Sequence, residues 1–176
     1  MTKTDPDSAA DFTGQQEVLF RGRLITVGRM PGGWESVVKA PAVCVLAIRD
    51  GQVLGVEQPR PVIGTNTWEL PAGIIDPQET ALQAAHRELA EETQLDGELE
   101  LLTQFWSSPG FTNEHTSLFL ARDLRPATAT PDEHEQITVS WRDLAELEQA
   151  VRSGSLVSSA STAVGLAWAF RISQDR

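Results

Sequence analysis

Three glutamates, Glu88, Glu91 and Glu92, fall within five residues of one predicted helix. Helical residues three and four apart share a face, so these carboxylates crowd into one arc and repel each other without a cation. Carboxylate oxygens are hard ligands suited to Mg²⁺ or Mn²⁺, ions that bind through a few carboxylates plus substrate phosphates. The spacing therefore indicates metal-assisted phosphate chemistry. The alternative for a charge run of this kind is a solvated acidic helix face.

The helix that carries these glutamates has a well-defined predicted start. Asp76, with Glu79 three residues later, has the pattern of a capping box, and Pro77 occupies the first helical position, where a missing N–H costs nothing. At about 100° per residue, an apolar stripe lies next to the acidic arc; it consists of Leu82, Ala85 and Leu89. The helix can therefore pack on a sheet while its acidic edge faces a cleft.

The segments around this helix predict a mixed α/β architecture. Strand patterns cover residues 17–21, 23–27, 34–39, 42–48, 52–58, 99–106, 116–121 and 136–141, and helix patterns cover residues 144–153 and 162–172. Asp50-Gly51 predicts a hairpin between two of these strands. We place a boundary near Ala40, which separates a small antiparallel β unit at residues 16–40 from a main domain at residues 41–176. Residues 1–15 are polar and predict a mobile tail.

Composition limits the classes of function. The chain has 176 residues, 40% of them hydrophobic, and a net charge of -11, which disfavours nonspecific binding to nucleic acid or to an anionic membrane. No stretch reaches the roughly 18 apolar residues of a membrane span. The single cysteine, Cys44, lies in an apolar run and predicts a core side chain rather than a nucleophile. We expect a protein of the reducing cytoplasm.

The positions of the charged residues closely resemble the Nudix box, the signature of hydrolases that cleave nucleoside diphosphates linked to another group. The matching residues are Gly73, Glu79, Arg87, Glu88, Glu91, Glu92 and Leu95. Gln94 is the one departure, because the family usually has glycine there to end the helix in a left-handed conformation. We expect Gly97 to take over this turn and to shift the helix end.

The resemblance implies a fold and a set of roles. The fold is a Nudix α/β/α sandwich with a mixed β-sheet, together with the small N-terminal antiparallel unit. Glu88, Glu91 and Glu92 hold divalent metal, helped by the backbone carbonyl of Ala72, which precedes the family's glycine. In the same family pattern, Glu79 and Arg87 form a scaffold pair, and a bidentate contact suits this role.

A second resemblance, to the ADP-ribose pyrophosphatase subfamily, rests on the segment of residues 107–114, Ser-Ser-Pro-Gly-Phe-Thr-Asn-Glu, in which Pro109 follows Leu95 by fourteen positions. It implies that Trp34 stacks on adenine, with Arg23 and Leu24 as weaker candidates for the same pocket. The other implied roles are phosphate binding by Arg60, substrate proximity of Glu69 and Glu114, and a general base in the loop of residues 132–135, where Glu133 is preferred over Glu135.

The two resemblances together imply a homodimeric enzyme that uses Mg²⁺, or Mn²⁺ or another divalent cation, to split ADP-ribose into AMP and ribose 5-phosphate. One alternative is a Nudix enzyme for a nucleotide sugar, a dinucleoside polyphosphate or an oxidised nucleotide. The other is a module that binds ADP-ribose without hydrolysis, which the complete set of box carboxylates disfavours. His86, His115 and His134 lack the spacing of metal ligands.

Overall fold

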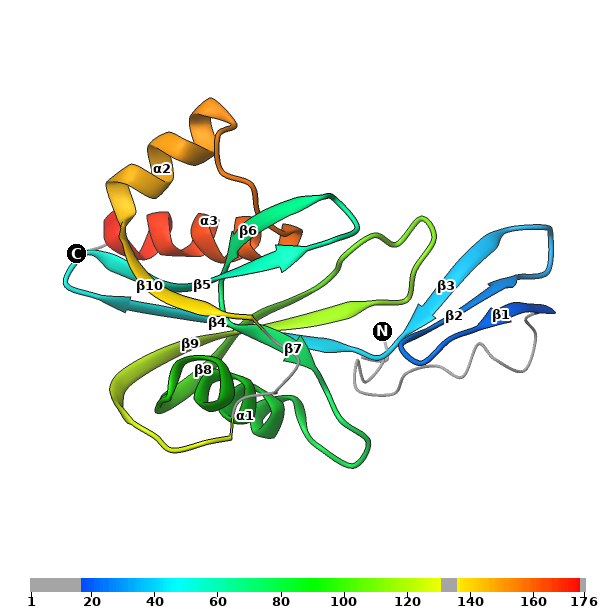
Figure 1. Ribbon diagram of the computed structural model, residues 1–176, viewed down its shortest axis with the longest axis horizontal. Helices are drawn as coiled ribbons and strands as arrows, with labels where there is room; N and C mark the ends of the chain where they lie inside the picture. Colours follow the sequence, from blue (N-terminus) through cyan, green and yellow to red (C-terminus); the bar gives the residue numbers. More distant parts are fainter. Residues whose placement is uncertain (1–16, 131–135, 175–176) are drawn as a thin grey trace, which may run out of the picture.

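The computed structural model describes residues 17–130 and 136–174. In chain order the elements are β1 (Glu17–Arg21), β2 (Ile25–Arg29), β3 (Glu35–Lys39), β4 (Ala42–Arg49), β5 (Gln52–Arg60), β6 (Thr65–Glu69), β7 (Ala72–Ile74), α1 (Ala81–Thr93), β8 (Leu95–Trp106), β9 (His115–Pro126), β10 (Thr138–Asp143), α2 (Leu144–Ser153) and α3 (Ala160–Gln174). They form two separate sheets with helices packed against the larger one (Figure 1).

The larger sheet has seven strands and is mixed. Its main path runs β10-β5-β4-β9-β8, with β6 beside β5 and β7 beside β4. β4 and β9 are parallel, whereas the other pairs are antiparallel. Asp50 and Gly51, with φ of 51° and 77°, form the predicted hairpin turn. β4 and β5 pair only next to this turn, and β7 pairs with the first three residues of β4, from Ala42 to Cys44.

Helices cover both faces of this sheet, with α2 and α3 on one side and α1 on the other (Figure 1). Successive strand residues point to opposite faces, so β4 contributes Val43, Val45 and Ala47 to a core with α1, and Cys44 and Leu46 to a core with α2 and α3. The predicted α/β/α sandwich with a mixed sheet is therefore confirmed. Cys44 is fully buried, as predicted, and burial raises the pKa of its thiol, as do the nearby carboxylates of Glu92 and Glu69.

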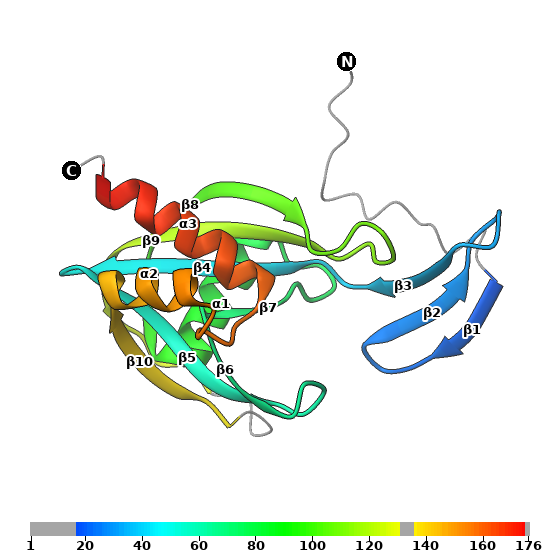
Figure 2. The same cartoon turned by 90° about the horizontal axis from the view of Figure 1, so that it is seen from above.

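The small N-terminal sheet is antiparallel, as predicted, in the order β1-β2-β3. It extends away from the larger sheet, and β3 leads directly into β4 (Figures 1 and 2). No helix in the described residues covers it. Large apolar side chains are consequently exposed on it and on its turns: Val18, Leu19, Phe20, Leu24, Ile25 and Trp34.

Sequence patterns missed two strands, β6 and β7. β7 has only three residues, and three successive residues of β6, from Thr67 to Glu69, are buried without alternation. β8 begins at Leu95, four residues before the predicted start, and β9 continues to Pro126. The predicted tail, residues 1–15, lies outside the described residues. No helix in the described ranges is long and apolar enough to cross a membrane.

Candidate active site

The helix α1 begins at Ala81, later than the sequence pattern predicts. Its N-cap is Thr80, whose hydroxyl accepts the Gln83 N–H at 3.2 Å while the Gln83 side-chain oxygen accepts the Thr80 N–H at 2.9 Å. The prediction that Asp76 caps the helix and that Pro77 is its first residue is wrong. Gln78 has a φ of 73°, a left-handed conformation that a right-handed helix cannot include.

The end of α1 also differs from the prediction. Gln94 itself adopts the left-handed conformation, with a φ of 56°, so the helix end is not shifted. Its side-chain amide donates to the carbonyl oxygens of Ala90 and Ala129, each at 3.1 Å. Gly97 does not make the turn. It lies in β8, where an added Cβ would stand 2.4 Å from the Arg122 carbonyl oxygen, so its glycine serves close strand packing.

The apolar face of α1 is rotated slightly from the predicted stripe. Ala85 and Leu89 are fully buried, as predicted, but Leu82 is 44% exposed and Ala84 is buried instead. The buried face packs on β4 and β9 through Val43, Val45 and Phe119. This packing fixes the helix against the sheet, and its acidic arc then faces β7.

Two of the three box carboxylates are buried against the backbone of β7. A Cβ added to Gly73 would stand 1.9 Å from Oε1 of Glu88, so only glycine leaves room for this carboxylate. The Ala72 N–H donates to Oε2 of Glu92 at 3.1 Å. Glu88 and Glu92 are each only 8% exposed. β7 and α1 thus hold two carboxyl groups in a restricted space.

Arg87 connects β7 and α1 to the loop between them. Its Nε and Nη2 donate to the Glu79 carboxylate at 3.0 and 2.8 Å, the bidentate contact expected of the pair. Nη1 donates to Glu88 at 2.7 Å and to Glu91 at 3.2 Å, and Nη2 also donates to the Ile74 carbonyl. The hydrogen bond from Arg87 lowers the pKa of Glu79, and that from Glu79 raises the pKa of Arg87.

The donor set of this region fits a hard divalent cation. It consists of carboxylate oxygens with backbone carbonyls nearby, and it carries more negative charge than one guanidinium balances. In the described part of the chain, however, no three histidine, cysteine, aspartate or glutamate side chains form a ready-made set of metal ligands. Glu88 and Glu91 instead contact Arg87. Each of these contacts uses one carboxylate oxygen, so a metal would be held through the second oxygen of each group.

A second charged group lies between β5, β6 and the start of α3. Arg60 donates to both oxygens of Glu69, at 2.8 and 3.0 Å, and the Thr67 hydroxyl donates to the same carboxylate at 2.6 Å. Burial acts to raise the pKa of Glu69, but hydrogen bonds from Arg60, Thr67 and Ser159 bring it below the ordinary value. The Glu69 side chain is only 6% exposed, whereas that of Arg60 is 45% exposed.

Sequence reasoning named Arg60 and Glu69 but did not pair them, and it missed Thr67 and Ser159. Thr67 precedes Glu69 by two residues, so strand alternation would have placed both on one face. No such local signal exists for Ser159, which reaches Glu69 from a segment ninety residues later.

The remaining predicted site residues lie toward the N-terminal sheet. Glu114 forms an ion pair with Lys39 at the end of β3. Trp34 is 70% exposed at the β2–β3 turn, and Arg23 is exposed at the β1–β2 turn. These turns lie at opposite ends of the five-residue strand β2, about 17 Å apart at 3.4 Å per residue. One chain therefore does not bring Arg23 and Trp34 together. Glu133 and the rest of its loop lie outside the described residues.

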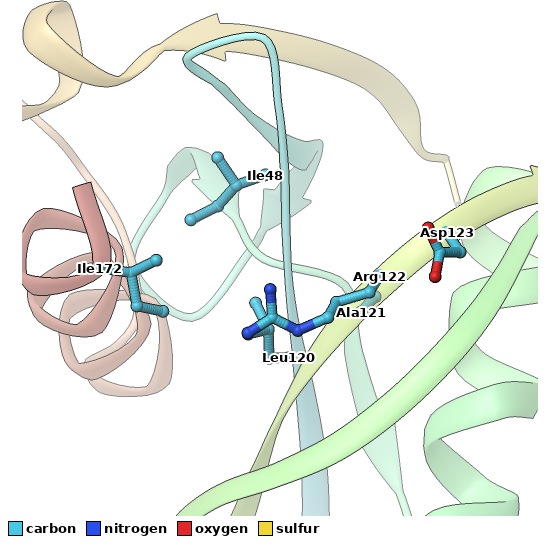
Figure 3. A pocket seen from close by; sticks show the side chains of 6 residues that line it. All are labelled: Ile48, Leu120, Ala121, Arg122, Asp123 and Ile172. Carbon is cyan, nitrogen blue, oxygen red and sulfur yellow. The ribbon is translucent and has the colours of Figure 1, made fainter. Parts of the chain in front are cut away.

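A hollow elsewhere on the larger sheet is separate from this region. It has a volume of about 240 Å³ and is lined by Ile48, Leu120, Ala121, Arg122, Asp123 and Ile172 (Figure 3). Its β9 residues come late in the strand, whereas Thr116 and Ser117, at the start of β9, pair with the β4 residues that lie beside β7. It therefore does not belong to the carboxylate site.

Comparison with known proteins shows the family. The NUDIX domain matches residues 38–158. The chain belongs to the Nudix family. It is 36% identical over 171 residues to the ADP-ribose pyrophosphatase of Mycobacterium tuberculosis, covering 89% of this chain and 83% of that protein. It is also 36% identical over 127 residues to the ADP-ribose pyrophosphatase of Bacillus subtilis, covering 66% of this chain and 69% of that protein.

A solved structure supports the fold. The crystal structure of an ADP compounds hydrolase matches with a TM-score of 0.74 and 22% identity, covering 92% of each chain. The predicted resemblance to Nudix hydrolases, with the ADP-ribose pyrophosphatases as relatives, is confirmed. The protein is a Nudix pyrophosphohydrolase. Nudix hydrolases generally use divalent cations, which fits the oxygen donors of α1 and β7.

Proposed function

We propose that this Nudix hydrolase splits ADP-ribose into AMP and ribose 5-phosphate with Mg²⁺ as its metal. The observation that supports the chemistry is the burial of the Glu88 and Glu92 carboxylates against the backbone of β7. The substrate is supported by similarity to ADP-ribose pyrophosphatases, in one case over 89% of the chain.

In this proposal, Glu88, Glu91, Glu92 and the Ala72 carbonyl hold the metal. When bound, the ion neutralises charge on the pyrophosphate and lowers the pKa of a bound water. Arg87 and Glu79 fix the loop before α1 to the helix through their bidentate contact. The fixed loop keeps the Gly73 backbone over the carboxylates, and the restricted space limits their alternative positions.

The substrate extends from this site past the second charged group. Arg60 binds phosphate through the exposed part of its guanidinium group. Its two hydrogen bonds to Glu69 hold that group in one orientation. Glu114 faces the substrate from the loop before β9, and Trp34 offers an indole face to adenine. Glu133 remains the proposed general base; it lies outside the described residues.

A homodimer is part of the proposal. The N-terminal unit, residues 16–40, carries exposed apolar side chains that no described helix covers, and such patches mark interaction surfaces. Trp34 and Arg23 lie at opposite ends of β2, so a pocket that uses both needs a second chain to complete it.

The proposed partner is a small anionic substrate, and the proposed location is the cytoplasm. The net charge of -11 disfavours binding to nucleic acid or to an anionic membrane.

Chromatographic product analysis tests the proposal. The protein is incubated with ADP-ribose, ADP-glucose, GDP-mannose or a diadenosine polyphosphate, each with Mg²⁺ and with chelator. We expect ADP-ribose to react fastest and to give AMP only when metal is present. If another compound reacts faster, the proposed metal chemistry stands but ADP-ribose is not the substrate. If the reaction proceeds in chelator, the proposed metal site is wrong.

A further inference from the structure

The end of β3 is bound to the loop between β8 and β9. The Val37 N–H donates to the Phe111 carbonyl at 2.7 Å, and Val37 forms a parallel bridge with Thr112. β3 leads into β4, which itself pairs in parallel with β9. The backbone contacts therefore extend this parallel pairing beyond the larger sheet, into the N-terminal unit.

Lys39 adds two contacts of its own to the same loop. Its backbone N–H donates to the side-chain oxygen of Asn113 at 2.9 Å, and its ammonium group donates to the carboxylate of Glu114. The side chains of Lys39 and Glu114 are 33% and 21% exposed. Ion pairs that are largely shielded from water are screened less by salt than exposed pairs are. This contact joins residues 75 positions apart in the chain.

The sheet register relates this contact to the carboxylate site. Ala42 of β4 pairs on one side with Ile74 of β7 and on the other with Thr116 of β9. Strands in a sheet are about 4.8 Å apart, so Thr116 lies about 10 Å across the sheet from Ile74. Glu114 precedes Thr116 by two residues. Its loop thus lies across β4 from β7, beyond the Ile74 end of that strand and on the side of the N-terminal sheet.

We propose that Lys39 is a positioning residue: it fixes the Glu114 carboxylate at the border of the active site and couples the N-terminal sheet to it. This inference rests on the proposed function insofar as Glu114 faces the substrate. Lys39 also balances the charge of Glu114, and without it a loosely held carboxylate would repel the anionic pyrophosphate. Loss of Lys39 should therefore weaken substrate binding rather than the chemical step, because neither Lys39 nor Glu114 belongs to the metal site.

Steady-state kinetics with ADP-ribose and Mg²⁺ test this role. We expect Lys39→Met, which keeps most of the apolar stem, to raise KM about 10-fold while kcat changes less than about 3-fold, the pattern of lost binding common to ground and transition states. Lys39→Arg should restore most of the affinity, because it keeps the charge. Glu114→Gln combined with Lys39→Met should raise KM no further than Lys39→Met alone, because the two residues act through one contact.

A control and a second measurement separate this inference from the proposed substrate. Arg29→Met removes an exposed ion pair with Glu17 in the same small sheet and should leave KM unchanged. Hydrogen exchange of the Val37 amide and of residues 107–114 should accelerate in Lys39→Met but not in Arg29→Met. If the wild type does not hydrolyse ADP-ribose, the substrate proposal fails while exchange still tests the coupling. Unchanged exchange, or an unchanged KM with an active wild type, overturns the role of Lys39.

Discussion

Gly73 offers a direct test of the close approach between β7 and the carboxylate helix. An added Cβ would stand 1.9 Å from Oε1 and 2.0 Å from Cδ of Glu88. The backbone of Gly73 does not require glycine, because its φ is outside the left-handed range. Gly73→Ala therefore acts through steric conflict with one side chain rather than through backbone strain.

The size of the effect follows from that conflict. Ordinary van der Waals contact begins near 3.4 Å, so the Glu88 carboxylate must move by about 1.5 Å, and misplacement of about 1 Å in a catalytic group can cost about 10²-fold in rate. We expect kcat to fall by at least about 10²-fold. Overpacking of this kind costs about 1–3 kcal/mol, which lowers Tm by about 2–4 °C per kcal/mol in a chain of this size.

The assay combines kcat at saturating Mg²⁺ with thermal unfolding of the metal-free protein. Gly110→Ala is the matched control, because no atom lies within 4 Å of its added Cβ and its φ is not left-handed, so its Tm should not change. In a Glu88→Ala background, Gly73→Ala should no longer destabilise the fold, since the conflicting carboxylate is absent. A Gly73→Ala protein with wild-type kcat would refute the reasoning, as would an equal loss of Tm in both backgrounds.

Three further predictions concern charged groups. Glu92→Gln should lower kcat by at least about 10²-fold at saturating Mg²⁺, because a metal-binding charge is lost; unchanged turnover would remove Glu92 from the site. Arg60→Lys should raise the KM for ADP-ribose about 10-fold, because lysine cannot present the planar fork, and an unchanged KM would exclude phosphate binding by Arg60. The pKa values of Glu69 and Glu79 are lowered in the folded protein, so both stabilise it above the unfolded value of about 4.3, and this stability is lost as pH falls through their folded values. Urea unfolding between pH 3 and pH 7 should therefore show declining stability below about pH 4.3, less steeply in Glu79→Gln; equal slopes would contradict this.

The sequence predicted the features that depend on local spacing. The arc of Glu88, Glu91 and Glu92 and the Glu79–Arg87 contact follow from positions within one helix and its preceding loop, and the hairpin at Asp50-Gly51 follows from a turn preference. The continuous apolar run of β4 likewise predicted a buried strand. In each case the residues involved are close together in the chain, so a short local sequence pattern predicts the feature.

The errors arose where local patterns compete or where partners are distant. Two capping patterns, at Asp76 and at Thr80, lie four residues apart, and the left-handed Gln78 decides between them. Gln94 replaces the expected glycine because its own amide stabilises the helix end. The contact of Lys39 with Glu114 depends on strand pairing, which no local pattern specifies.

The parallel pairing of β4 with β9 determines when the active site can form during synthesis. Ala42 pairs with Thr116, so the centre of the sheet cannot close until 74 more residues are made, which takes roughly 4–15 s at about 5–20 residues per second. During this interval the apolar β4 segment, fully buried in the finished protein from Val43 to Ala47, waits without its partner and can aggregate. The rate at which the ribosome translates the residues between β4 and β9 therefore influences the yield of folded enzyme. The active site forms only late in synthesis.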